Sequence, residues 1–150
     1  MEIKYQLFEK EGLVIQKYNG IFSIDKYVKY SHFIAQNFAS KPVKKILIDF
    51  RNLKFTELVD VMPDKYASNL EKVTAAREKV NRDELKNKDF VLAIWVDEPV
   101  PTLIAHQFVN NFSHMNYNYC STREEVVKIL KLSDCQEVLE SMIDNLENTF

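Results

Sequence analysis

Acidic, basic and amide side chains follow two apolar runs of this sequence, at residues 46–48 and 90–96. The candidate ligand- or partner-binding residues among them are Asp49, Arg51, Asn52 and Asp97. Short apolar runs that end in this way are typical of buried parallel strands, whose carboxyl ends meet at one edge of a sheet. Two carboxylates in one cleft would suit acid/base chemistry. In the alternative interpretation, Asp49 and Asp97 cap loops or pair with lysines.

Histidine and cysteine, the other chemically versatile residues, form no motif. The three histidines, at 32, 106 and 114, lack the spacing of helical metal ligands, and no Cys-His or Ser-His-Asp arrangement is readable. Cys120 and Cys135 form no metal-binding pair, and we expect Cys120 to be a small buried apolar residue. We therefore predict no catalytic residue, no metal and no cofactor.

Glycine content and charge exclude two large classes of function. The chain has only two glycines, Gly12 and Gly20, whereas phosphate-binding loops place several within a few residues. Twenty basic residues against 22 acidic residues give a formal net charge of −2, without a basic block that would attract a nucleic acid. The sequence therefore predicts neither a nucleotide-binding loop nor a nucleic-acid partner.

Length and hydropathy indicate one globular unit. The chain has 150 residues, of which 46% are hydrophobic, and no apolar run approaches the ~20 residues that cross a bilayer. The first five residues lack the layout of a secretion signal. We therefore expect no membrane span and a cytoplasmic location, with both thiols reduced.

Hydrophobic periodicity predicts an α/β domain around these strands. Alternation over 2–8 and 13–18 favours an antiparallel hairpin, and a further short strand is expected at 117–120. A helical stripe follows Ser23, a predicted N-cap, and ends at Lys41-Pro42, and another helix follows Pro99 and Pro101. The prediction is a mixed, mostly parallel sheet of about five strands with four to five helices. Residues 51–55 are expected to be irregular.

Three more helical segments complete the prediction. Asp60 is expected to cap a helix that leads into a charged stretch over 77–89. Ser121 with Glu124, or Thr122 with Glu125, forms a capping box for the next helix. We expect residues 1–132 to form the domain and 133–150 an amphipathic helix on that domain or on a dimer partner. Its candidate dimer residues are Leu139, Met142, Ile143 and Leu146.

The order of these elements, with the phrases at 46–51, 90–96 and 119–125, resembles the STAS-like family, in the bacterial branch that contains the sporulation anti-sigma-factor antagonist. The resemblance covers about residues 1–132 and implies a regulatory domain that binds a protein. In phosphorylation-switched members, an Asp-Ser-Ser-Gly-like turn follows the strand equivalent to 46–50. This chain reads Phe55-Thr56-Glu57-Leu58, with neither that serine nor that glycine, and Thr56 is the nearest hydroxyl.

Aromatic side chains leave a second hypothesis open. Tyr30 and Phe33 lie off the main stripe of the first helix, so they are candidates for an exposed partner or ligand contact, with a wider buried stripe as the alternative. The favoured function is a non-enzymatic interaction domain that binds a protein, itself included as a homodimer. The alternative is a carrier or sensor of a small apolar or lipid-like ligand, held between the sheet and the first helix.

Overall fold

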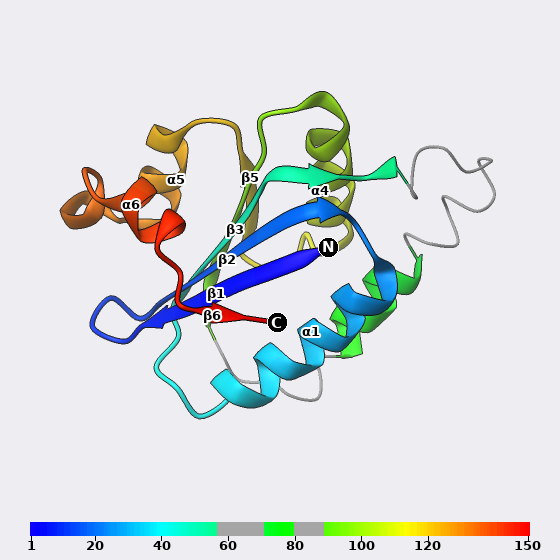
Figure 1. Cartoon of the computed structure of the whole chain (residues 1–150), viewed down its shortest axis with the longest axis horizontal. Helices are drawn as coiled ribbons and strands as arrows, with labels where there is room; N and C mark the ends of the chain where they lie inside the picture. The colour runs from blue at the N-terminus through cyan, green and yellow to red at the C-terminus, as the bar shows by residue number, and fades with distance from the viewer. Residues whose placement is uncertain (57–70, 80–88) are drawn as a thin grey trace.

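A computed structural model describes residues 1–56, 71–79 and 89–150, and a mixed sheet forms its centre. The strand order is β5-β4-β3-β2-β1-β6, as Figure 1 shows. The strands are β1 (Glu2–Phe8), β2 (Leu13–Ile21), β3 (Lys45–Lys54), β4 (Val91–Trp95), β5 (Tyr117–Cys120) and β6 (Asn148–Thr149). β2, β3, β4 and β5 run parallel to one another, whereas β1 pairs antiparallel with β2 and β6. The predicted α/β class and the N-terminal hairpin are confirmed.

Gly12 allows the hairpin and the crossover to meet. Its φ of +59° lies in the left-handed region, which side chains rarely adopt. A Cβ there would stand 2.8 Å from the carbonyl oxygen of Pro42, and the Gly12 carbonyl accepts hydrogen bonds from the amides of Lys44 and Lys45. The turn therefore joins the start of β2 to the start of β3.

The two apolar runs lie side by side within the sheet, as predicted. β3 pairs with β4 from Lys45 opposite Val91 to Asp49 opposite Trp95. β3 also continues past the predicted end at residue 50, so the stretch expected to be irregular is a strand. The reason is that β2 extends to Ile21 and pairs with this part of β3. The register of this pairing shifts between Lys17 and Asn19.

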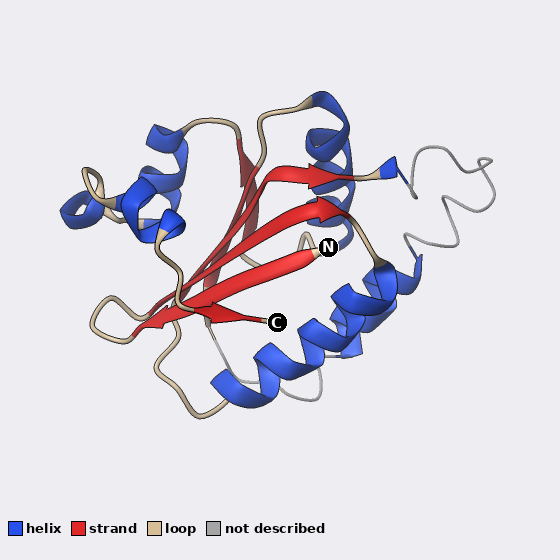
Figure 2. Cartoon of the chain, viewed as in Figure 1, coloured by secondary structure: helices blue, strands red, loops and turns tan. Residues whose placement is uncertain are grey.

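Helices cover both faces of the sheet (Figure 2). One face carries α1 (Ile24–Phe38), the helical residues 71–79 and α4 (Pro99–Asn111), whose apolar side chains join one large core cluster. The other face carries α5 (Arg123–Leu130), the 3₁₀ turn η1 (Ser133–Cys135) and α6 (Leu139–Asp144), which join a second cluster. The sheet therefore separates two cores. Within the described residues, no helix is both long and apolar enough to span a bilayer.

Local signals explain where two helices begin. Ser23 is the N-cap of α1, because its hydroxyl accepts a hydrogen bond from the amide of Lys26. Thr122 and Glu125 form the capping box of α5, which selects one of the two overlapping boxes in the sequence. The predicted cap at Asp60 lies outside the described residues, as do 80–88 of the charged stretch.

The C-terminal segment differs from the single amphipathic helix expected over 133–150. It contains η1, the six-residue α6 and the strand β6, which pairs with Lys4 and Tyr5 of β1. The physical reason is that the segment crosses from the face that carries α5 to the β1 edge of the sheet (Figure 1). Leu139, Ile143 and Leu146 are 0%, 0% and 7% exposed, and Met142 is half-buried, all against their own domain.

Candidate functional site

Asp49 and Arg51 meet at the carboxyl end of β3. Residues two apart on a strand point to the same face, so both side chains lie on the α6 side of the sheet. Asp49 is only 1% exposed. Nε of Arg51 donates to Oδ1 of Asp49 at 3.0 Å and Nη2 donates to Oδ2 at 2.9 Å, and the Arg51 amide also donates to Oδ1. This two-bond geometry neutralises the buried carboxylate.

Glu140 and Trp95 complete the surroundings of Arg51. Glu140 of α6 accepts from Nη1 and Nη2, each at 3.0 Å, and the guanidinium carbon lies 3.6 Å from the ring centre of Trp95 in β4. Burial lowers the pKa of Arg51, but the hydrogen bonds that it donates to both carboxylates, with their negative charges, outweigh the effect of burial and raise the pKa above its ordinary value. Arg51 therefore stays charged and ties α6 to β3 and β4. We call Asp49, Arg51, Trp95 and Glu140 the arginine cluster.

The remaining predicted polar residues do not join this cluster. Asp97 is exposed in the loop after β4, and Asn52 is exposed on β3. Asp49 is tied to Arg51, so the predicted pair of Asp49 and Asp97 is not a pair of free carboxylates. Glu140 was absent from the sequence-based candidates, and its contact spans 89 positions of the chain, a distance over which no local pattern operates.

A shallow groove of about 240 Å³ lies where β3 ends and α4 begins. Its lining residues are Leu53, Lys54, Phe55, Thr56, Glu98, Val100 and Pro101. Thr56 is exposed, and Val100 is 39% exposed. The structure thus brings Thr56 next to α4 and places it away from the arginine cluster.

Exposed apolar side chains extend this groove on both sides. Ile21 of β2 is 52% exposed and pairs in register with Lys54, which lines the groove. Leu103 is 55% exposed and follows Val100 by three positions on α4, so both side chains lie on one helix face. We call the groove together with Ile21 and Leu103 the strand-end surface. Most large apolar side chains elsewhere in the described residues are covered.

Tyr30 and Phe33, the aromatic candidates, pack against the end of the chain. Tyr30 is 1% exposed and Phe33 is half-buried, and the ring centres of both lie 5.1 Å from that of Phe150. The hydroxyl of Tyr30 has no hydrogen-bond partner among the residues that the structure describes, and burial raises the pKa of this tyrosine well above its ordinary value. The arrangement matches the wider buried stripe that was the alternative for these residues.

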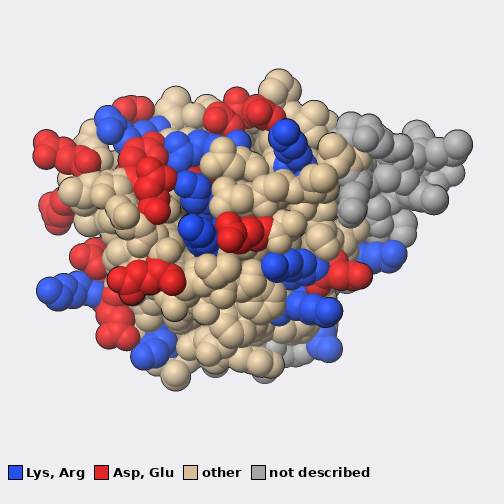
Figure 3. Space-filling model, in the orientation of Figure 1, with Lys and Arg blue, Asp and Glu red and all other residues tan. Residues whose placement is uncertain are grey.

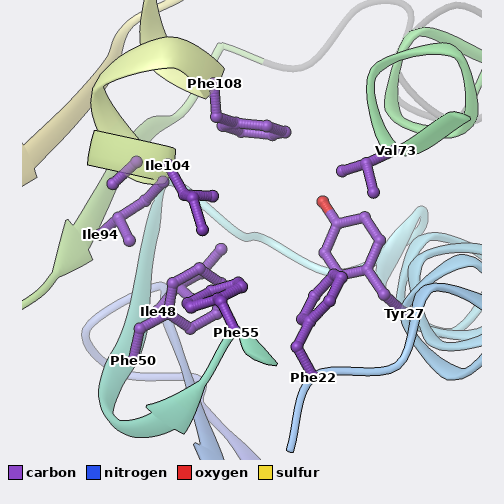
Figure 4. A pocket seen from close by; sticks show the side chains of 10 residues that line it. Phe22, Tyr27, Ile48, Phe50, Phe55, Val73, Ile94, Ile104 and Phe108 are labelled. Atoms are coloured by element: carbon purple, nitrogen blue, oxygen red, sulfur yellow. The ribbon is translucent and has the colours of Figure 1, made fainter. Parts of the chain in front are cut away.

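A small apolar cavity lies between the sheet, α1 and α4 (Figure 4). Its volume is about 30 Å³, and aromatic and aliphatic side chains form its wall: Phe22, Tyr27, Ile48, Phe50, Phe55, Val73, Ile94, Ile104, Ala105 and Phe108. Pockets that hold small organic ligands measure roughly 300–1,000 Å³. As it stands, this cavity holds only a few atoms.

The histidines and cysteines occupy structural surroundings. Both ring nitrogens of His106 have neighbours, with Nδ1 3.3 Å from the Tyr119 hydroxyl and Nε2 2.9 Å from the Asn110 amide nitrogen. Burial, followed by the negative charge of Glu125, raises the pKa of the Cys120 thiol to about 12. Among the described residues, no group of histidine, cysteine, aspartate or glutamate side chains is arranged to hold a metal ion.

Comparisons with known proteins give a likeness to solved structures only. No family model matches the chain, and no curated protein matches it. Among solved structures, the chain is similar to the anti-sigma factor antagonist SpoIIAA in its unphosphorylated form, with 12% sequence identity and a TM-score of 0.43. The likeness covers 86% of this chain and 97% of that one.

Proposed function

We propose that this chain is a non-enzymatic domain that binds another protein through the strand-end surface. The observation that carries the proposal is the exposure of Val100 on the groove wall, of Ile21, which pairs with the groove residue Lys54, and of Leu103, which lies one helical turn from Val100. Exposed apolar side chains that lie together on a soluble domain mark contact sites, whereas isolated ones are common everywhere.

The state of the polar residues supports the same interpretation. Of the two carboxylates that were candidates for acid/base chemistry, Asp49 is bound to Arg51 within the arginine cluster and Asp97 lies outside it. On the face drawn in Figure 3, basic and acidic side chains are interspersed, and such a surface suits a protein partner better than a polyphosphate. The proposed domain therefore acts by contact, with an apolar centre and a mixed charged rim.

Thr56 adds a possible point of regulation to this surface. It is an exposed hydroxyl on the groove wall, with Lys54 on the same wall. Phosphate on Thr56 would add negative charge beside the apolar patch and would weaken an apolar contact there. We propose a cytoplasmic location for the chain, supported by its two free cysteines.

The second candidate function is a carrier of a small apolar ligand, and the aromatic wall of the cavity in Figure 4 favours it. Such a ligand requires α1 or α4 to move outward, since the cavity is about 30 Å³. Native mass spectrometry of the purified chain tests this function. Retained extra mass would support a carrier, and a spectrum of the bare chain would contradict it.

A photo-crosslinking amino acid at position 98 tests the first proposal. Glu98 is exposed, lines the groove and makes no side-chain cap hydrogen bond with α4, so its replacement should leave the fold intact. The matched control carries the same amino acid at Lys10, in the exposed β1–β2 turn at the opposite end of the sheet.

Irradiation of cells that express each form should yield a discrete protein adduct from position 98 and none from position 10. Mass spectrometry of the adduct identifies the partner and distinguishes a second copy of this chain from another protein. Equal adducts from both positions, or none from position 98, would contradict the proposal.

A further inference from the structure

Arg77 is a buried arginine on the face of the sheet opposite the arginine cluster. It lies on the helical segment 71–79 and is 6% exposed. Its Nε and Nη2 both donate to the hydroxyl oxygen of Tyr117, at 3.2 and 3.1 Å, and its guanidinium carbon lies 5.5 Å from the Tyr117 ring centre. A neutral hydroxyl therefore provides its hydrogen bonds.

This charge has no acidic counterpart in the part of the chain that the structure describes. Neither an aspartate nor a glutamate of residues 1–56, 71–79 or 89–150 lies within ion-pair distance of Arg77, whereas Arg51 has two such partners. Burial of an unpaired ion is strongly unfavourable, even after the protein relaxes around it. An anion beside Arg77 would offset that cost.

A cavity beside Arg77 offers room for such an anion. It lies between α1, β2, β3 and the 71–79 segment and has a volume of about 20 Å³. Apart from Arg77 and Gln16, its walls are apolar: Val14, Ile34, Ala35, Phe38, Val43, Ile46 and Phe90. A cavity of about 10–15 Å³ already accommodates one water-sized atom.

Gln16 supplies a second hydrogen-bond donor to the cavity wall. It is 4% exposed, and its Oε1 accepts a hydrogen bond from the Tyr18 hydroxyl at 3.2 Å. The Nε2 group of Gln16 is a further donor, and no hydrogen bond from it to another described side chain or backbone oxygen is seen. Two buried donors, one of them cationic, thus line an otherwise apolar space.

We propose that this cavity is a binding site for a small monovalent anion of the size of chloride, held by Arg77 and Gln16. A single negative charge on the anion would balance the single positive charge of Arg77. The volume admits one atom of that size and excludes phosphate or sulfate, each of which has five heavy atoms. The apolar remainder of the wall favours a weakly hydrated anion.

Bromide provides a direct crystallographic probe of the site. Crystals of the full chain soaked in sodium bromide should show an anomalous peak in the cavity, within hydrogen-bond distance of the Arg77 guanidinium. A cavity that is empty or holds water, with bromide only at surface lysines, would overturn the proposal.

Thermal unfolding tests the same site in solution. With ionic strength held constant by sodium gluconate, whose anion is too large for the cavity, added bromide should raise the Tm of the wild-type chain until the site saturates. Arg77→Met should abolish that rise. The matched surface variant Arg123→Met should retain it, since the Arg123 side chain is 42% exposed and pairs with Glu124.

A wild-type Tm that does not respond to bromide would overturn the proposal. Should Arg77→Met fail to fold, Gln16→Met serves in its place, because it removes one donor and keeps the cation. A weaker response to bromide in that variant supports the site, and an unchanged response overturns it.

Discussion

The arginine cluster and the strand-end surface both lie at the carboxyl ends of the central strands, and they differ in how their side chains are satisfied. In the arginine cluster, Asp49 and Glu140 each accept two hydrogen bonds from the guanidinium of Arg51, and Trp95 covers that guanidinium. On the strand-end surface, Ile21 and Leu103 are more than half exposed. Residues that look capable of chemistry therefore stabilise the fold, while simple apolar residues remain uncovered for a partner.

The largest expected effect follows from removal of Arg51. Arg51→Ala leaves Asp49 charged and buried without a counterion and removes the contact with Trp95. We expect a loss of about 3 kcal/mol in the free energy of unfolding. Urea denaturation measures this loss.

The exposed Arg123→Ala serves as the control for Arg51→Ala and should change the free energy of unfolding by no more than about 0.5 kcal/mol. Equal, small effects of both variants would show that the arginine cluster is not a structural tie.

Ile143→Val tests whether α6 belongs to the core on the same face of the sheet as the arginine cluster. Ile143 is 0% exposed, so loss of one methyl group should cost about 1 kcal/mol. Val138, which is 50% exposed, provides the control, and Val138→Ala should have little effect. Light scattering should give the same mass for wild type and Ile143→Val. Conversion of a dimer to a monomer by Ile143→Val would instead place this residue in a subunit interface.

The fold was largely predictable from local patterns in the chain. The apolar runs around Leu47 and Ala93 required burial on both faces, and the alternation of residues 2–8 required one covered face. The start of α5 followed from Thr122 and Glu125, which lie three positions apart and form the hydrogen bonds of a capping box. These features depend on residues that are close together in the sequence, so they can be predicted from it.

The arginine cluster and the C-terminal path were not predictable in the same way. Glu140 reaches Arg51 only because α6 folds back over the sheet, and β6 is two residues long, which is too short for a periodic signal. The apolar period of residues 138–146 predicted a seam of which Leu139, Ile143 and Leu146 are buried and Val138 is exposed, and it gave no sign of the crossing to the β1 edge. Exposure of Leu103 likewise depends on which faces of α4 the sheet covers.

The pH dependence of stability tests the N-terminal cap of α5, just after β5, and a smaller effect is expected there. The polar groups of this cap, like those of the arginine cluster, are hydrogen-bonded to each other. Hydrogen bonds from the amides of Ser121 and Thr122 hold the pKa of the Glu125 carboxyl below its ordinary value. A carboxyl with a lowered folded pKa stabilises the fold above its unfolded pKa, and this contribution disappears as the pH falls through the folded pKa. Comparison of Tm for wild type and Glu125→Gln should show wild type more stable near neutrality and the difference shrinking below about pH 4. A difference that is constant with pH would contradict this role.

The most direct test of the account is the adduct formed from the photo-crosslinker at position 98 in two folded backgrounds. Leu103→Asp should change the free energy of unfolding by no more than about 0.5 kcal/mol, because this side chain is 55% exposed, and it should abolish the adduct. Glu140→Gln weakens the arginine cluster and should leave the adduct at wild-type yield. Loss of the adduct in Glu140→Gln with its retention in Leu103→Asp would contradict the account and would place the binding site at the arginine cluster.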